Sequence, residues 1–264
     1  MSACRSFRVP SRSWNGSWQT KERAVIREMP VALSYDGGTE AVMMATPSDL
    51  EEFALGFSFT ERIISDAGQI ESLEVEPRER GVEIRMRLSS NVRERLITRR
   101  RLKAGPAGCG LCGIESLGEA LPQLAPVVSN FRVSAQKLID GMKRLEPQQL
   151  LNSETKAAHA AGFMTLDGAV EAVREDVGRH NALDKLCGYL IRSGVAPKDG
   201  VVLMTSRVSV ELVQKAAVMG APVLAAISAP TSLAVEEAER LGVCVVGVVR
   251  SDGLEVFSHA ERVG

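Results

Sequence analysis

Short apolar runs alternate with amphipathic stretches through the second half of the chain. The runs GVVLMT, APVLAAIS and VCVVGVV are separated by SVELVQKAAVMG and TSLAVEEAERLG, whose apolar residues recur at helical spacing. Apolar strands that alternate with helices are typical of parallel βαβ units covered on both faces. Before them, residues 160–165 and 169–174 flank a Leu-Asp-Gly turn and predict a hairpin, followed by a helix through HNALDKLCGYLI.

The first half of the chain has a mixed pattern. PVALSYDGG and EAVMMAT predict two strands joined at a turn, and the alternation in VEIRMRL predicts a half-buried strand. Thr46-Pro47-Ser48-Asp49 predicts a helix capped by Thr46 and running to about Ile64. The first 20 residues show no comparable pattern, which predicts a poorly ordered lead-in.

Two prolines and weak periodicity mark residues 120–132 as the predicted domain boundary. A chain of 264 residues can form one large domain or two smaller ones. The predicted fold class is therefore α/β (α+β overall), with a smaller mixed α+β domain over residues 20–125 and an α/β domain over residues 126–264.

Composition narrows the functional classes. The net charge of −1 gives no field that favours nucleic acid, no window approaches the ~18 apolar residues of a membrane span, and the N-terminus lacks the apolar core of a signal peptide. Five cysteines in a chain without an export signal predict a reducing cytoplasm and thiols kept for chemistry or packing. Cys187 and Cys244 lie in apolar runs and are predicted to be buried.

Residues 104–117 read AGPAGCGLCGIESL and place Cys109 and Cys112 among four glycines. Glycine loses more conformational freedom on folding than any other residue, so chemistry rather than packing explains this composition. Three kinds of chemistry compete: a metal half-site, a redox disulfide and a sulfur carrier. Residues 93–103 carry six Lys or Arg and one acidic residue, a setting that favours an exposed thiolate.

The sequence disfavours the first two kinds. A structural zinc site needs four ligands, and neither a second C-x-x-C nor a close histidine pair is present. A zinc deaminase would need H-x-E, but His159 is followed by two alanines, so we expect no metal and no deamination. A thioredoxin-like pair would open a helix directly after a strand, whereas this pair lies in a glycine-rich stretch behind a basic segment. A sulfur carrier is therefore favoured, and two loop cysteines without a function are the remaining alternative.

Three predicted strand exits form a second candidate site. Ligands of open α/β sheets bind beyond the carboxyl ends of the strands, where residues 205–207, 228–231 and 250–253 lie. Arg207 and Arg250 are suited to phosphate, and the first two segments open helices whose free N–H groups favour anions. Ordinary caps and turns would look similar, so a phosphate-bearing ligand and plain turn chemistry both stay open.

Several long motifs resemble one family. GPAGCGLCGIESL, EDVGRHNALDK, SRVSVELVQKA and SAPTSLAVEEAERLGV are similar to segments of the formate dehydrogenase accessory sulfurtransferases, the FdhD family, and the resemblance covers about residues 24–260. PVALSYDGG and ATPSDLEEFALGF extend it into the first half. The chain departs from the family at Thr155–His159 and at TSRVS, where glycines are common, and these departures concern local loop geometry.

The resemblance implies a cytoplasmic, homodimeric sulfurtransferase whose second domain has a cytidine-deaminase-like fold. It implies that a cysteine desulfurase loads sulfur as a persulfide on Cys109, with Cys112 beside it. The sulfur would pass to the bis(molybdopterin guanine dinucleotide) molybdenum cofactor of formate dehydrogenase. The implied cofactor-binding stretch is Val248, Val249, Arg250, Ser251, Asp252 and Gly253, joined by Arg207 from the strand exits, and a GDP-like nucleotide can occupy the same site.

Two questions stay open after the resemblance. The EDVGRHNALDK block contains Asp176, Arg179, His180 and Lys185, and no role can be assigned to them beyond lining or bracing a site. The alternative function is a non-catalytic chaperone that binds the molybdenum cofactor or a nucleotide, in which the cysteines only dock the cofactor.

Overall fold

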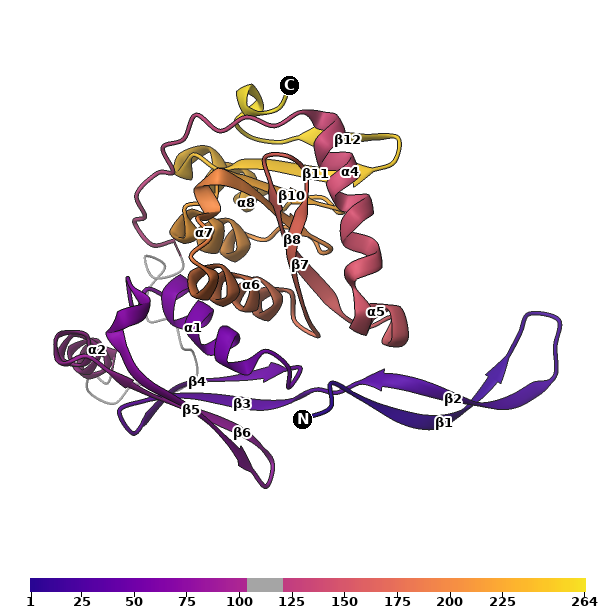
Figure 1. Cartoon of the computed structure of the whole chain (residues 1–264), viewed down its shortest axis with the longest axis horizontal. Helices are drawn as coiled ribbons and strands as arrows, with labels where there is room; N and C mark the ends of the chain where they lie inside the picture. Colours follow the sequence, from indigo (N-terminus) through magenta and orange to yellow (C-terminus); the bar gives the residue numbers. More distant parts are fainter. Residues whose placement is uncertain (104–120) are drawn as a thin grey trace.

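The strands in the described part of the protein form three sheets (Figure 1). The structure, a computed structural model, describes residues 1–103 and 121–264. The strands are β1 (Cys4–Arg12), β2 (Trp18–Ile26), β3 (Met29–Tyr35), β4 (Gly38–Ala45), β5 (Ile70–Arg78), β6 (Gly81–Leu88), β7 (His159–Thr165), β8 (Val170–Asp176), β9 (Gly200–Met204), β10 (Val223–Ala226), β11 (Cys244–Arg250) and β12 (Gly253–Val256). The helices are α1 (Leu50–Thr60), α2 (Ser90–Lys103), α4 (Ala135–Leu145), α5 (Leu150–Thr155), α6 (Arg179–Ser193), α7 (Val210–Met219) and α8 (Ser232–Leu241). This mixture of helices and sheets confirms the predicted α/β class.

The largest sheet has the strand order β12-β11-β10-β9-β7-β8. Its centre, β9-β10-β11, is parallel as the alternating pattern predicts, while β7, β8 and β12 pair antiparallel with their neighbours. Side chains of the central strands alternate between two hydrophobic cores: Val202 and Leu224 join the core with α6, α7 and α8, and Val201 and Val223 join the other with α4. Helices therefore cover both faces of this sheet.

The smaller sheet has the order β4-β3-β6-β5 and packs against α1. Val31, Leu33 and Ile84 point into its core, where they meet Phe53 of α1. The hairpin β3–β4 turns at Asp36 and Gly37, and both have positive φ, which glycine adopts without strain. The three strands predicted in this region are confirmed.

The predicted start of α1 is wrong. The helix begins at Leu50 instead of near Pro47, and it ends at Thr60 rather than Ile64. Thr46 cannot cap it because its polar groups bind the larger sheet: its backbone N–H donates to Asp176 Oδ2 at 2.9 Å, and its Oγ1 accepts from the backbone N–H of Val177 at 3.1 Å. Tertiary contacts override the local capping preference.

Helices α1 and α6 lie side by side between the two larger sheets (Figure 1). They approach at two glycines: a Cβ on Gly56 would overlap the backbone of Asp184, and a Cβ on Gly188 would overlap the backbone of Glu52. Glycine is required at both positions because no side chain fits. The first and second halves thus share a packed interface, and the division at residues 125/126, like the cytidine-deaminase-like fold, stays a prediction.

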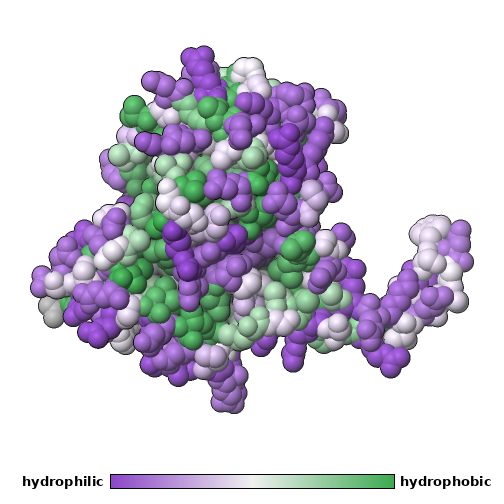
Figure 2. Space-filling view, in the orientation of Figure 1, coloured by the Kyte–Doolittle hydropathy of each residue, from purple (hydrophilic) through white to green (hydrophobic). Residues whose placement is uncertain are grey.

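The N-terminal segment is ordered as a ribbon, so the predicted poorly ordered lead-in is wrong. β1 and β2 pair antiparallel in register from Cys4 with Ile26 to Arg12 with Trp18 and project from the body (Figure 1). Mostly hydrophilic and intermediate side chains cover the ribbon (Figure 2). Both of its faces meet solvent, so its sequence lacks the apolar alternation by which half-buried strands are recognised.

The described helices include none with the length and apolar character of a membrane span. Cys187 and Cys244 are buried, as predicted, and burial raises the pKa of both thiols, that of Cys244 to about 12. Both therefore stay protonated and act as small apolar side chains.

Candidate functional site

The predicted persulfide pair, Cys109 and Cys112, lies outside the described residues. The basic segment before it forms the end of α2, which stops at Lys103. The site that the structure does describe is the edge of the six-stranded sheet where β9, β10 and β11 end.

The three predicted strand-exit segments lie next to one another at this edge. The backbone N–H of Val208 donates to the carbonyl of Ala229, and the N–H of Thr231 donates back to the carbonyl of Val208 at 3.0 Å. The N–H of Val248 approaches the carbonyl of Ser228 at 3.4 Å, so the third segment adjoins the second. The expectation that these segments converge is confirmed by the geometry.

The stretch 248–253 contains a β-bulge. The register between β11 and β12 shifts between Gly247 and Arg250, and Val248 has φ of 50°, a strained value for a β-branched residue. The side chain of Val249 is buried in the core, whereas Arg250 is exposed. Bulges recur beside functional sites, where they redirect side chains, and this one turns Arg250 out of the sheet.

Arg207 and Arg250 both project from the edge. Both are exposed, and neither side chain forms an ion pair or hydrogen bond with another described residue. Arg207 follows β9 and Arg250 is the last residue of β11, and β10 lies between these two strands. Two guanidinium groups that project from one edge suit a ligand with more than one anionic group.

A fourth segment completes this edge, and the sequence had predicted only that its residues line or brace a site. β7 runs antiparallel to β9, and β8 antiparallel to β7, so β8 ends at the same edge as β9. The turn after β8 begins α6 with Arg179 and His180, and His159 stands opposite Asp176 at the start of β7. The buried Nε of Arg179 has no hydrogen-bond partner among the described residues.

The histidines of this edge are held neutral. Burial, aided by the neighbouring Arg179, lowers the pKa of His159 and lowers that of His180 from 6.5 to about 4. His180 Nε2 lies 3.3 Å from Ser209 Oγ and 3.9 Å from Glu211 Oε2, at the start of α7. At neutral pH the edge therefore offers fixed positive charge from arginines and neutral ring N–H groups as possible donors.

The low pKa of His180 predicts a loss of stability in acid. The unfolded chain protonates this residue below about pH 6.5, but the folded chain does so only near pH 4, so stability falls as the pH falls through this window. Urea unfolding at pH 7 and pH 4.5 should show the wild type losing about 2–3 kcal/mol more than His180→Gln. Equal losses in the two proteins would contradict the assigned protonation state.

Asp176 and Lys185 brace the site. Their side chains are fully buried and form an ion pair of 2.7 Å. Asp176 Oδ1 also accepts from the backbone N–H of Gly178 at 2.8 Å and from Asn181 Nδ2 at 2.9 Å, and Lys185 Nζ donates to the carbonyl of Thr46 at 3.0 Å. The pair thus fixes the turn before α6 and ties it to the smaller sheet. This answers the open question for these two residues.

The described part of the chain contains no group of three His, Cys, Asp or Glu side chains placed to hold a metal ion.

Comparisons with known proteins find matches over most of this chain. The model of the FdhD/NarQ family matches residues 26–264. Three relatives are named sulfur carrier protein FdhD. The one from Agrobacterium fabrum is 49% identical over 94% of this chain and 92% of its own length. Those from Bordetella petrii and Cupriavidus necator are 45% and 46% identical over 92% and 96% of this chain, and over 88% of their own lengths in both cases. The crystal structure of a proposed formate dehydrogenase accessory protein from Desulfotalea psychrophila superposes with a TM-score of 0.80 at 24% identity, covering 100% of both chains. That likeness supports the fold.

Proposed function

Because the chain belongs to the FdhD/NarQ family, we propose that it is a sulfur carrier that serves formate dehydrogenase as a sulfurtransferase in the cytoplasm. The observation that carries this proposal is the similarity to proteins named sulfur carrier protein FdhD, which extends over more than nine-tenths of the chain. The C-x-x-C segment supplies the thiols that such a carrier needs.

We assign the carrier thiol to Cys109. Its thiolate attacks the terminal sulfur of a persulfide on the donor, a cysteine desulfurase. A new S–S bond forms at Cys109 while the S–S bond of the donor breaks, and the donor cysteine leaves as a thiolate. The thiolate is the nucleophile in such exchange, and the arginines and lysine of residues 99–103 favour it over the thiol.

The acceptor in this proposal is the bis(molybdopterin guanine dinucleotide) molybdenum cofactor, which the protein handles as a substrate. The strand edge is the surface that would bind the phosphates of its guanine nucleotides. Among the described residues, the guanidinium groups of Arg207 and Arg250 have no partner there, and neither does the buried Nε of Arg179. A guanidinium binds phosphate through two parallel hydrogen bonds, which fixes the orientation as well as the affinity.

Removing an arginine from this edge should weaken GDP binding. A charge-assisted contact contributes ~1.5–3 kcal/mol, so Arg207→Ala or Arg250→Ala should raise the dissociation constant about 10- to 150-fold in calorimetry. Arg8→Ala, an exposed arginine on the ribbon, is the matched control and should leave it unchanged. Sulfur loading of Cys109 should survive both edge substitutions. Wild-type GDP affinity in both variants would place the nucleotide elsewhere.

Sulfur loading tests the proposed function against its alternative, a non-catalytic chaperone. The purified chain is incubated with a cysteine desulfurase and cysteine, then digested without reductant for mass spectrometry. A carrier gains one sulfur atom on the peptide that contains Cys109, and Cys109→Ala gains none there. A chaperone that only binds the cofactor gains no sulfur on either protein. Homodimer formation is a separate prediction, which sedimentation of the same sample would measure.

A further inference from the structure

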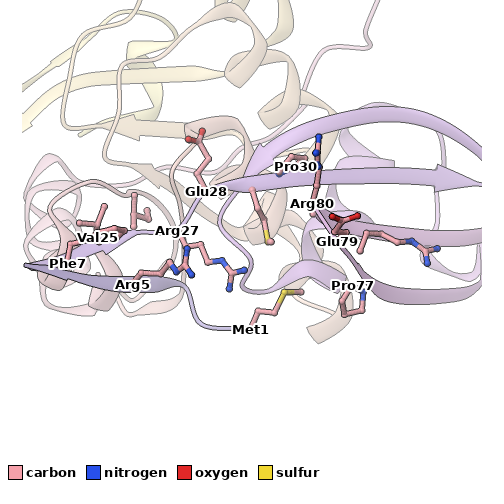
Figure 3. Close-up of a pocket in the computed structure, with 14 residues that line it drawn as sticks. Met1, Arg5, Phe7, Val25, Arg27, Glu28, Pro30, Pro77, Glu79 and Arg80 are labelled. Carbon is pink, nitrogen blue, oxygen red and sulfur yellow. The ribbon is translucent and has the colours of Figure 1, made fainter.

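A basic groove lies where the N-terminal ribbon joins the body (Figure 3). The ribbon forms one wall, and the turn between β5 and β6 forms the other. They enclose a cavity of about 590 Å³. Gly81 makes the floor compact, since a Cβ there would overlap the carbonyl of Pro30. The residues that line the groove include none of those described at the strand edge of the larger sheet.

Three of the guanidinium groups that line this groove have no partner in the part of the chain that the structure describes. Arg5 and Arg27 lie on the ribbon side, and Arg80 lies on the opposite turn (Figure 3). None of the three forms a side-chain hydrogen bond or ion pair with another described residue, whereas Arg78 beside them pairs with Glu76 and Glu83. Unpaired like charges around one cavity repel each other, so an anion in the groove would be stabilised by all three.

Apolar side chains share the same wall. Strand residues two apart point to the same face, and Arg5, Phe7 and Val25 lie on one face of the ribbon, with Arg27 continuing the series. Phe7 is 49% exposed and Val25 is 39% exposed. An isolated two-stranded ribbon is at best marginally stable in water, so an occupant that covers these side chains would also hold the ribbon in place.

We propose that this groove binds an extended acidic segment of a partner protein, with carboxylates on the three arginines and apolar side chains against Phe7 and Val25. The outer edges of the ribbon have no strand partner among the described residues, so backbone hydrogen bonds to such a segment are available. Charge favours the pairing, because residues 1–28 carry six Lys or Arg and two Glu while the whole chain has a net charge of −1.

A nucleic acid fits the groove less well. Glu28 and Glu79 also line it, so the positive charge along the groove is interrupted. The walls between the arginines are apolar, whereas nucleic-acid grooves combine continuous positive charge with stacking platforms. A polypeptide can combine carboxylates and apolar side chains along one strand, and it matches both features of the groove.

The probe for this proposal is a short fluorescent peptide of alternating glutamate and leucine, titrated with the full chain and followed by anisotropy. Substituting Arg5, Arg27 and Arg80 together by serine should weaken binding at least about thirtyfold, and each single substitution about three- to tenfold, since partly exposed contacts are screened. The matched control substitutes Arg8, Arg132 and Lys198, which are exposed and lie outside the groove. It should bind within about twofold of the wild type.

Three results would overturn the proposal. The triple groove variant could bind the peptide as the wild type does, or the control variant could lose as much, which would indicate diffuse attraction. A single-stranded oligonucleotide of equal charge could bind more tightly and depend on the same arginines, which would make the groove a nucleic-acid site. Circular dichroism melts show whether the triple variant is folded. If it is not, the peptide affinities of the three single variants test the proposal instead. None of these measurements depends on sulfur loading of Cys109. The proposed groove and the proposed sulfur-carrier function can therefore be refuted separately.

Discussion

Formate dehydrogenase activity should disappear when the only sulfur carrier in the cell is the Cys109→Ala variant of this chain. The substitution removes the thiolate on which the persulfide forms, and Cys187 and Cys244 cannot replace it, because both are buried with raised pKa values. The measurement is formate oxidation in extracts of a strain without its own carrier, complemented by each variant. Activity should fall to the level of the empty vector.

Cys112→Ala and Cys4→Ala are the controls for this prediction. Cys4→Ala should support wild-type activity, since Cys4 lies on the ribbon and its thiol donates to Glu154 Oε2 at 3.7 Å. Cys112→Ala should have an intermediate effect if Cys112 assists by resolving mixed disulfides. Equal loss in Cys109→Ala and Cys112→Ala would make the pair the functional unit, and wild-type activity in Cys109→Ala would refute the assignment of the carrier thiol.

The second large effect concerns stability. Lys185→Met keeps most of the side-chain volume but leaves the fully buried carboxylate of Asp176 without its cation. Breaking a buried ion pair in this way costs about 3–5 kcal/mol of unfolding free energy. Urea unfolding at pH 7 measures it, and Lys198→Met, at an exposed lysine, should change the result by less than about 0.5 kcal/mol.

A double variant shows whether the loss comes from the uncompensated charge. Asp176→Asn combined with Lys185→Met removes both charges and should be more stable than Lys185→Met alone, because no ion is then buried without a partner. If the double variant lost the sum of the two single losses, Asp176 and Lys185 would act independently, and their role in tying α6 to the turn at Thr46 would be wrong.

The elements with strong periodicity could be predicted from the sequence. The central strands β9, β10 and β11 are apolar on both faces because helices cover both faces of their sheet, and that burial is what makes the runs recognisable. The strand exits were predictable for the same reason, since parallel strands end at a common edge. The burial of Cys187 and Cys244 follows from the apolar runs that contain them.

The parts that failed depend on contacts between distant residues. Thr46 has a good local capping sequence, but its polar groups bind Asp176 and Val177, which lie about half the chain away. Arg179 and His180 were predicted only to line or brace a site, and their place at the strand edge was not predicted because a hairpin pattern does not reveal its direction relative to β9. One signal could have found them: a polar Gly-Arg-His turn between a strand and a helix has the same position as the strand exits that were recognised.

The movement of a labelled sulfur atom tests the central claim most directly. The chain is loaded by a cysteine desulfurase with cysteine that carries a heavy sulfur isotope, freed of donor and cysteine, and mixed with inactive formate dehydrogenase made in a strain without a sulfur carrier. If the chain carries sulfur, the label leaves the Cys109 peptide and appears in the formate dehydrogenase in proportion to the activity that is gained. Activity that rises while the label stays on the chain, or that rises equally with unloaded protein, would contradict the account.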